Sequence, residues 1–92
     1  MGMKSYRVRF FGRVQGVNFR RSTADMARRL GVRGGWVMNM PDGSVEALLQ
    51  GPEERVRELV DYCRTSIRLA SVTRVQLEEV EAEEFMDFTV RL

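Results

Sequence analysis

Alternating apolar and polar positions predict a β-strand at the beginning of the chain. Between residues 4 and 11, Tyr6, Val8 and Phe10 fall on one face, and the side chains between them, most of which are polar, fall on the other. A period of two residues is typical of a strand that buries one face in a core. The alternation stops at residues 12–18, where two glycines permit backbone conformations that other residues resist, so this segment is predicted to be a loop.

A spacing of three and four residues predicts a helix after this loop. Its inward positions fall at i, i+4 and i+7: Thr23, Ala27 and Leu30. Ser22, with Asp25 three positions later, is a candidate capping box at the start of this helix. Gly31 suits its C-terminal end, because glycine readily adopts the left-handed conformation found there.

A second helix is predicted to begin at or near Pro52, whose missing N–H costs nothing in a first helical turn. Residues at i, i+3, i+4 and i+7 form one apolar stripe along it: Val56, Leu59, Val60 and Cys63. Charged side chains occupy its other faces. The stripe therefore predicts that Cys63 is a packing residue of the core.

A β-hairpin is predicted between the two helices. Residues 36–39 and 44–50 have strand composition, and Pro41-Asp42-Gly43 lies between them. Proline presets the first turn angle, and the Asp-Gly pair supplies the positive backbone angles that reverse the chain.

Two further strand patterns, at residues 72–77 and 85–92, complete the chain. The acidic stretch between them, residues 78–84, is predicted to be an exposed turn. The order strand-helix-strand-strand-helix-strand, with an extra C-terminal strand, fits a ferredoxin-like α+β sandwich. We expect a single domain over residues 1–92, in which two helices cover one face of an antiparallel sheet.

The chain has one cysteine and no histidine, which limits its chemistry. A lone cysteine cannot form an intramolecular disulfide, and without histidine the usual zinc ligand sets cannot be assembled. Mechanisms in which histidine is the acid or base are excluded as well. We therefore expect no metal and no cofactor, and any catalysis has to rely on other groups.

The net charge of +2 is distributed unevenly along the chain. Residues 1–33 carry nine basic side chains against one acidic one, a net charge of +8, and the remainder carries −6. Such a positive segment favours an anionic ligand, namely phosphate, a nucleotide or nucleic acid. The alternative is that these charges only decorate a solvated sheet face and helix.

No apolar run approaches the roughly 20 residues that a membrane span requires. The first residues also lack the uninterrupted apolar stretch of a signal peptide. We therefore expect a cytoplasmic protein that does not contact a membrane.

The loop between the first strand and the first helix is the strongest candidate for chemistry. A helix N-terminus with inward-turned amides forms a nest for an anion, and Arg20 at this junction would add a planar fork of donors that matches two phosphoryl oxygens. Arginines in a first helical turn are also commonly solvated, so these residues alone leave both interpretations open.

Other nucleotide-binding and nucleic-acid-binding patterns fit poorly. The Walker and dinucleotide-binding glycine patterns are absent from the sequence. An RNA-recognition module would share the topology, but residues 44–50 offer no aromatic side chain for base stacking. We therefore expect no nucleic-acid partner.

The segment Gly12-Arg13-Val14-Gln15-Gly16-Val17-Asn18-Phe19-Arg20 closely resembles the signature loop of the acylphosphatase family. Further matches follow in the family's order: Ala27-x-x-Leu30-Gly31-Val32, Gly35-Trp36-Val37-x-Asn39, Asp42-Gly43-x-Val45-Glu46-Ala47 and Gln50-Gly51-Pro52. Weaker similarity at residues 70–75 and 88–90 extends the resemblance over nearly the whole chain.

The resemblance implies a metal-free hydrolase that splits an acyl phosphate into a carboxylate and inorganic phosphate. In such proteins the signature arginine binds phosphate and the asparagine after Gly-Trp-Val orients the attacking water, roles that fall here on Arg20 and Asn39. The backbone amides expected to hold the phosphate are those of Arg13, Val14, Gln15, Gly16, Val17, Asn18 and Phe19. We expect a monomer whose only partners are substrate and product. The alternative is a regulatory domain of the same fold that binds phosphate without turnover.

Three positions depart from the family's pattern. Gly34-Gly35 stands where the family usually has one residue fewer, and we expect the additional residue to be absorbed in a flexible loop, which leaves Asn39 in phase. Met38 occupies a position that is often basic, but alternation places it on the face opposite to Asn39. Residues 65–69 lack the Gly-Pro character that is frequent in the family. This difference concerns the connection between the second helix and the next strand, and not the site.

Overall fold

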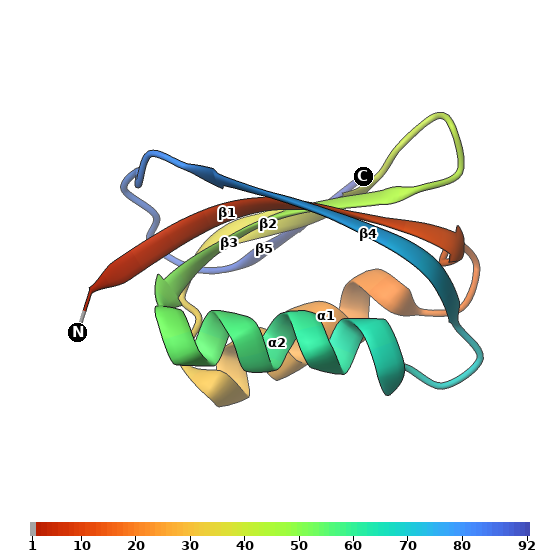
Figure 1. The fold of residues 1–92 in the computed structure, drawn as a ribbon, viewed down its shortest axis with the longest axis horizontal. Coiled ribbons are helices and arrows are strands. Elements are labelled where there is room, and N and C mark those ends of the chain that lie inside the picture. Colours follow the sequence, from red (N-terminus) through yellow and green to blue (C-terminus); the bar gives the residue numbers. More distant parts are fainter. Residues whose placement is uncertain (1) are drawn as a thin grey trace.

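The computed structural model describes residues 2–92, which form five strands and two helices (Figure 1). In chain order these elements are β1 (Met3–Arg13), α1 (Phe19–Leu30), β2 (Gly34–Asn39), β3 (Val45–Pro52), α2 (Glu53–Thr65), β4 (Ser71–Val80) and β5 (Thr89–Arg91). This order confirms the predicted ferredoxin-like arrangement with an added C-terminal strand.

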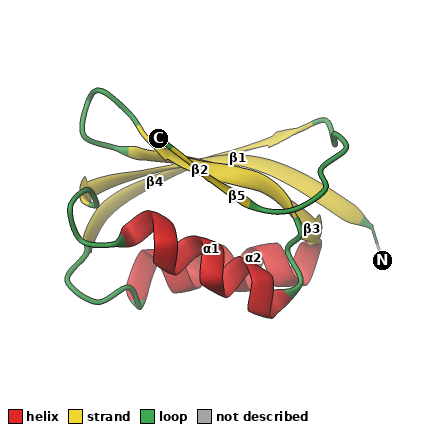
Figure 2. Ribbon diagram, turned by 180° about the vertical axis from the view of Figure 1, so that it is seen from behind, coloured by secondary structure: helices red, strands yellow, loops and turns green. Residues whose placement is uncertain are grey.

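The strands form one sheet in the order β4-β1-β3-β2-β5. The pairs β1–β3, β1–β4 and β2–β3 are antiparallel, as predicted, whereas β5 joins the outer edge of β2 in parallel. Both helices lie against the same face of the sheet, and the other face is not covered by a helix (Figures 1 and 2). No helix within residues 2–92 is long and apolar enough to cross a membrane.

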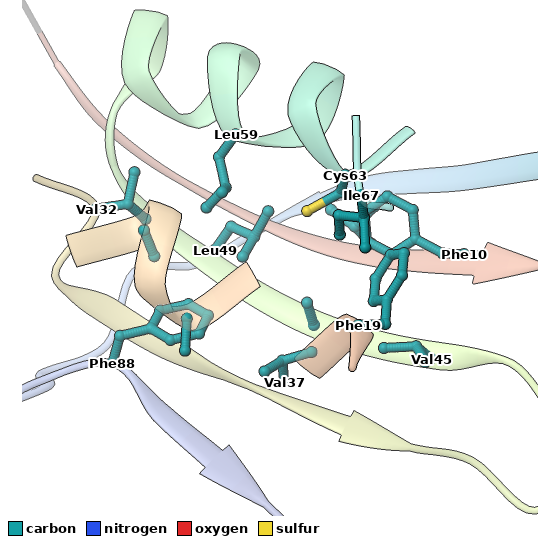
Figure 3. Packing of buried hydrophobic residues seen from close by; sticks show 14 of the residues in the cluster. Phe10, Phe19, Val32, Val37, Val45, Leu49, Leu59, Cys63, Ile67 and Phe88 are labelled. Atoms are coloured by element: carbon teal, nitrogen blue, oxygen red, sulfur yellow. The ribbon is translucent and has the colours of Figure 1, made fainter. Parts of the chain in front are cut away.

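The core lies between the helices and the sheet (Figure 3). Val8 and Phe10 of β1 are fully buried there, and the ring of Phe19 at the start of α1 packs against Phe10 with 5.2 Å between centroids. Leu59 and Cys63 contribute the predicted stripe of α2. Burying one such large apolar side chain stabilises the fold by about 1.5–3 kcal/mol, which holds α1 and its preceding loop against the sheet.

The first helix begins earlier than predicted. Its first residue is Phe19 and its N-cap is Asn18, which adopts a left-handed φ of 63° and makes no capping hydrogen bond with its side chain. Ser22 lies inside the helix and donates its backbone N–H to the Asn18 carbonyl at 3.1 Å, so the predicted Ser22–Asp25 capping box is wrong. Burial of Phe19 explains the earlier start. Gly31 is the C-cap with a φ of 76°, as predicted.

Gly34 and Gly35 are not part of a flexible loop, which corrects the sequence prediction. Both are paired residues of β2, opposite Gln50 and Leu49 of β3. Gly35 has a φ of 120°, and a Cβ built on it would lie only 1.6 Å from the carbonyl oxygen of Leu48. The glycines therefore permit a close approach of two strands, directly before the segment that carries Asn39.

The C-terminal strand is shorter than predicted. Only Thr89–Arg91 pair with β2, whereas residues 81–88 form a loop that ends at the buried ring of Phe88. Part of the acidic stretch predicted to be a turn, from Glu78 onwards, extends β4 instead. Gln50 fixes the loop with two hydrogen bonds to the Glu83 backbone, at 2.6 and 2.9 Å. No local pattern in the sequence predicts hydrogen bonds between residues this far apart.

Candidate active site

Arg20, Asn39 and four of the seven residues of the predicted phosphate-binding loop meet at a cavity of about 330 Å3, which Arg13, Gln15 and Val17 do not line. The signature loop and the first turn of α1 form one side, and the ends of β2 and β5 form the other. Its lining consists of Val14, Gly16, Asn18, Phe19, Arg20, Arg21, Asn39 and Val90. Arg20 and Asn39, which are 19 positions apart in the sequence, therefore share one cavity.

A larger groove of about 570 Å3 runs along α2 and β4. Its lining contains apolar residues such as Val56, Val60 and Leu77, and ion-paired side chains such as Arg57 and Arg64. It contains neither the signature loop nor Asn39. The smaller cavity is therefore the candidate active site.

The signature loop is shaped by buried apolar anchors and by residues in the left-handed region. Val14, Val17 and Phe19 place their side chains in the core, so the polypeptide between them stays at the surface. Gly16 and Asn18 both have positive φ, at 75° and 63°. Such changes of backbone hand turn successive N–H groups toward one point, which is the geometry of an anion nest. Arg13 is the last residue of β1 and pairs with Ser71, so the loop begins one residue later than Arg13.

Gln15 connects this loop to the β2–β3 hairpin. Its side-chain Nε2 donates hydrogen bonds to the carbonyl oxygens of Met40, at 2.8 Å, and Ser44, at 2.9 Å. Met40 directly follows Asn39, so these two bonds set the position of the loop relative to the end of β2.

The hairpin is itself ordered by Asp42. Its Oδ1 accepts hydrogen bonds from the hydroxyl and the backbone N–H of Ser44, at 2.5 and 2.9 Å. These bonds, together with the charge of Arg9, hold the pKa of the Asp42 carboxyl below its usual value. The turn that follows Asn39 is therefore well defined at neutral pH.

Arg20 is half-buried in the first turn of α1. Its Nη1 donates a hydrogen bond to the backbone carbonyl oxygen of Arg91 at 2.6 Å. Within residues 2–92 no carboxylate lies within 4.0 Å of its guanidinium nitrogens. The guanidinium is thus oriented by a neutral acceptor, and its charge and remaining N–H groups stay available to an anion.

Asn39 is the last residue of β2 and pairs with Val45. It shares the helix side of the sheet with buried Val37, while Met38 faces the opposite side, as alternation predicted. Within the described part of the chain the Asn39 side-chain amide makes no hydrogen bond to protein. It is therefore free to bind a water molecule or a substrate at the cavity.

The described part of the chain offers neither a cluster of metal ligands nor a thiol nucleophile. Residues 2–92 contain no group of three or more histidine, cysteine, aspartate or glutamate side chains that could hold an ion. Cys63 is buried in the core, where loss of solvation raises the pKa of its thiol to about 12, so it stays protonated. The chemistry available at the cavity consists of the guanidinium groups of Arg20 and Arg21, the neutral side-chain amides of two asparagines, and backbone N–H groups.

The model of the family described as Acylphosphatase matches residues 6–90. The chain belongs to the acylphosphatase family. An acylphosphatase from Thermoplasma volcanium is 47% identical over 85 residues, covering 92% of this chain and 93% of the relative. One from Nitrosococcus oceani is 55% identical over 80 residues, covering 87% of this chain and 89% of the relative.

Solved acylphosphatase structures have the same fold. The structure from Coxiella burnetii superimposes with a TM-score of 0.90 at 34% identity and covers 97% of this chain and 93% of that one. The Bacillus subtilis structure has a TM-score of 0.88 at 32% identity, with coverages of 97% and 99%. The resemblance, the fold and the acylphosphatase activity predicted from the sequence are therefore confirmed.

Sequence reasoning missed three parts of this acylphosphatase cavity. Arg21 and Val90 line it, and the carbonyl of Arg91 holds Arg20. Arg21 could have been noticed because it adjoins Arg20 in the first helical turn. Nothing in the local sequence places β5 at the cavity, because its pairing with β2 joins segments more than 50 residues apart.

Proposed function

We propose that Arg20 and the amides of the signature loop bind the phosphoryl group of an acyl phosphate while Asn39 positions the attacking water. The observation that carries this proposal is the single cavity lined by Arg20, by loop residues and by the free amide of Asn39. The loop amides are those of residues 13–19, of which Val14, Gly16, Asn18 and Phe19 line the cavity directly.

The chemistry of an acyl phosphate suits this set of groups. The oxygen of water forms a bond to phosphorus while the phosphorus bond to the acyl oxygen breaks, and its electron pair leaves with the carboxylate. A carboxylate is a weak base, so the leaving group needs no proton from the enzyme. Catalysis then consists mainly of placing water in line and stabilising charge on the phosphoryl oxygens.

Asn39 orients the water but does not deprotonate it. A neutral amide oxygen accepts a hydrogen bond and is too weak a base to take the proton. A phosphoryl oxygen of the substrate receives that proton, so the products are a carboxylate and inorganic phosphate. This route needs neither histidine nor metal, in keeping with a chain that has no histidine.

The experiment measures benzoyl phosphate hydrolysis in the presence of a chelator. Arg20→Ala and Asn39→Ala are compared with Arg29→Ala, which changes an exposed arginine of the same helix outside the cavity. Loss of one preorganised donor costs about 3 kcal/mol in the barrier, so each site variant should lose roughly a hundredfold in rate, and Arg29→Ala should not.

Inhibition by inorganic phosphate separates the two roles. Arg20→Ala should lose this inhibition, whereas Asn39→Ala should keep it because the phosphate cradle is intact. Full activity of a folded variant at either position would refute the role of that residue.

The acylphosphatase relatives disfavour the alternative predicted from the sequence, a phosphate-binding domain without turnover. The free amide of Asn39 argues against it, because binding phosphate alone requires no residue that positions water. A folded wild-type protein that binds phosphate and does not hydrolyse benzoyl phosphate would favour the alternative. The single domain over residues 1–92, the monomeric state, the cytoplasmic location and the absence of a nucleic-acid partner stay predictions from the sequence, and sedimentation would test the monomer.

A further inference from the structure

A second arginine lines the candidate active site. Arg21 directly follows Arg20 in the first turn of α1, and its exposed side chain contributes to the wall of the same cavity. The proposed binding of the phosphoryl group uses Arg20 and the loop amides and leaves Arg21 without a role.

Arg21 differs from Arg28 of α1 in its surroundings. Arg28, two turns later on the same helix, lies 3.5 Å from the carboxylate of Asp25 and donates to the Phe88 carbonyl oxygen at 3.3 Å. No carboxylate in the described part of the chain lies within 4.0 Å of the guanidinium nitrogens of Arg21. The cavity therefore has a second positive charge that the protein itself does not neutralise.

The cavity extends beyond the space for a phosphoryl group. Its volume of about 330 Å3 lies at the lower end of the range for small-molecule pockets, so part of the acyl chain fits inside as well. Val90 of β5, with 44% of its surface exposed, adds an apolar side chain to the lining of the cavity.

The direction of the reaction places the acyl chain relative to Arg21. In-line displacement puts the leaving oxygen on the side of phosphorus opposite to the attacking water. Asn39 holds that water from the sheet, and Arg21 belongs to the helix on the other wall of the cavity. The acyl group therefore leaves the phosphorus on the side away from Asn39, and Arg21 is a positive charge of the cavity that does not lie on the strand of Asn39.

We propose that Arg21 binds a carboxylate at the far end of the acyl chain, so that the preferred substrates are monophosphates of short dicarboxylic acids. This inference rests on the proposed function, because it takes the phosphoryl group to be held at Arg20. The planar guanidinium matches a carboxylate with two parallel hydrogen bonds. A short chain ending in a compact carboxylate also fits the small volume of the cavity.

The test compares two substrates of equal chain length, succinyl phosphate and butyryl phosphate, which differ in the terminal carboxylate. The kcat/KM ratio of the two is measured for the wild type, Arg21→Gln and Arg29→Gln at low and moderate salt. Arg29→Gln is the matched control, because Arg29 is exposed on the same helix and does not line the cavity.

The wild type should favour succinyl phosphate, mainly through a lower KM. Arg21→Gln should reduce the ratio about fivefold, the factor that corresponds to about 1 kcal/mol, the upper value for exposed ion pairs. Arg21→Glu should reduce it further through repulsion. The preference should weaken with salt, and Arg29→Gln should keep the wild-type ratio.

A wild type without preference for succinyl phosphate, or an Arg21→Gln protein with an unchanged ratio, would overturn the inference. An equal decrease in kcat/KM for both substrates in Arg21→Gln would also overturn the inference, because it would indicate that Arg21 attracts any anion. These results are distinguishable from failure of the proposed function, which would be seen as retained activity of Arg20→Ala or Asn39→Ala on both substrates.

Discussion

The guanidinium of Arg20 and the backbone carbonyl of Arg91 are joined by a hydrogen bond of 2.6 Å between Nη1 and O. Arg91 pairs in β5 with Met38 of β2, which directly precedes Asn39. The two proposed catalytic side chains are therefore held relative to one another by the pairing of β2 with β5. Arg20 receives its orientation from the strand that lies beside Asn39.

Removal of residues 91 and 92 should impair phosphate binding by Arg20. A hydrogen bond to a charged group contributes about 1.5–3 kcal/mol, so kcat/KM should fall about tenfold or more, with weaker inhibition by phosphate. Both residues are exposed, so thermal unfolding should change little. Leu92→Ala, which keeps the neutral carbonyl of Arg91, is the control. Equal activity of the truncated protein and Leu92→Ala would contradict the role of this bond.

Gln15→Ala should separate the signature loop from the hairpin after Asn39. The substitution removes hydrogen bonds to the carbonyls of Met40 and Ser44. At about 1 kcal/mol each, their loss should lower the free energy of unfolding by about 2 kcal/mol, and misplacement of the cradle should lower kcat about tenfold. Urea unfolding and benzoyl phosphate turnover measure the two effects. Gln76→Ala, at an exposed position of β4, should alter neither.

Gly35→Ala should destabilise the protein far more than Gly31→Ala. Both glycines have positive φ, which costs an alanine about 1–2 kcal/mol. A Cβ at Gly31 meets open space, whereas one at Gly35 would lie 1.6 Å from the Leu48 carbonyl oxygen. Denaturant unfolding should show a loss in unfolding free energy of about 1 kcal/mol for Gly31→Ala and of more than about 3 kcal/mol for Gly35→Ala. The larger loss is expected because the backbone around Gly35 has to move to accommodate the Cβ. Similar losses at the two positions would show that the strands separate easily.

Burial of Cys63 should make stability fall at alkaline pH. The thiol ionises near its ordinary pKa of 9.0 when unfolded but near about 12 when folded, so above pH 9 the unfolded state releases a proton that the folded state retains. The contribution of the neutral, buried thiol to the free energy of unfolding is fully present below pH 9. It is lost as the pH rises toward 12, by about 1.4 kcal/mol per pH unit.

The measurement for Cys63 is the difference in unfolding free energy between the wild type and Cys63→Ala. Other titrating groups cancel in this difference, which should therefore shrink between pH 9 and 11. A constant difference over that range would mean that the folded thiol ionises normally.

Periodicity in the sequence was sufficient to predict most of the fold. The alternation of Tyr6, Val8 and Phe10 and the stripe from Val56 to Cys63 correspond to the two sides of the observed core. These patterns arise because burial requires apolar residues at the period of the element, and the period is a local property.

Features set by tertiary contacts could not be predicted in the same way. The helix start at Phe19 depends on packing against Phe10, which overrides the capping pattern at Ser22. The strand position of Gly35 depends on how closely the Leu48 backbone approaches. Propensity and capping patterns are weak priors that tertiary context commonly overrides.

The candidate site was predictable to the extent that it is encoded in contiguous motifs. Arg20 and Asn39 were predicted from a resemblance to the family, and the cavity brings them together. Arg21, Val90 and the carbonyl of Arg91 were missed. The last two are brought to the cavity by the short parallel strand β5. Every residue type has a backbone carbonyl, so a sequence pattern does not reveal which one accepts a hydrogen bond.

Because few contacts hold β5, the side of the site that it forms should open more easily than the core. After the buried ring of Phe88, the strand is held by three residue pairs with β2 and by the guanidinium of Arg91 over the Trp36 ring at 4.7 Å, and all of its residues are exposed. Segments with few buried contacts open locally at a lower free energy than the whole domain. Fraying of these residues would release Arg20 from its acceptor while the core stays intact. On warming, activity should therefore decline before the helices melt, and amide hydrogen exchange in β5 should outpace that in β1 and β3.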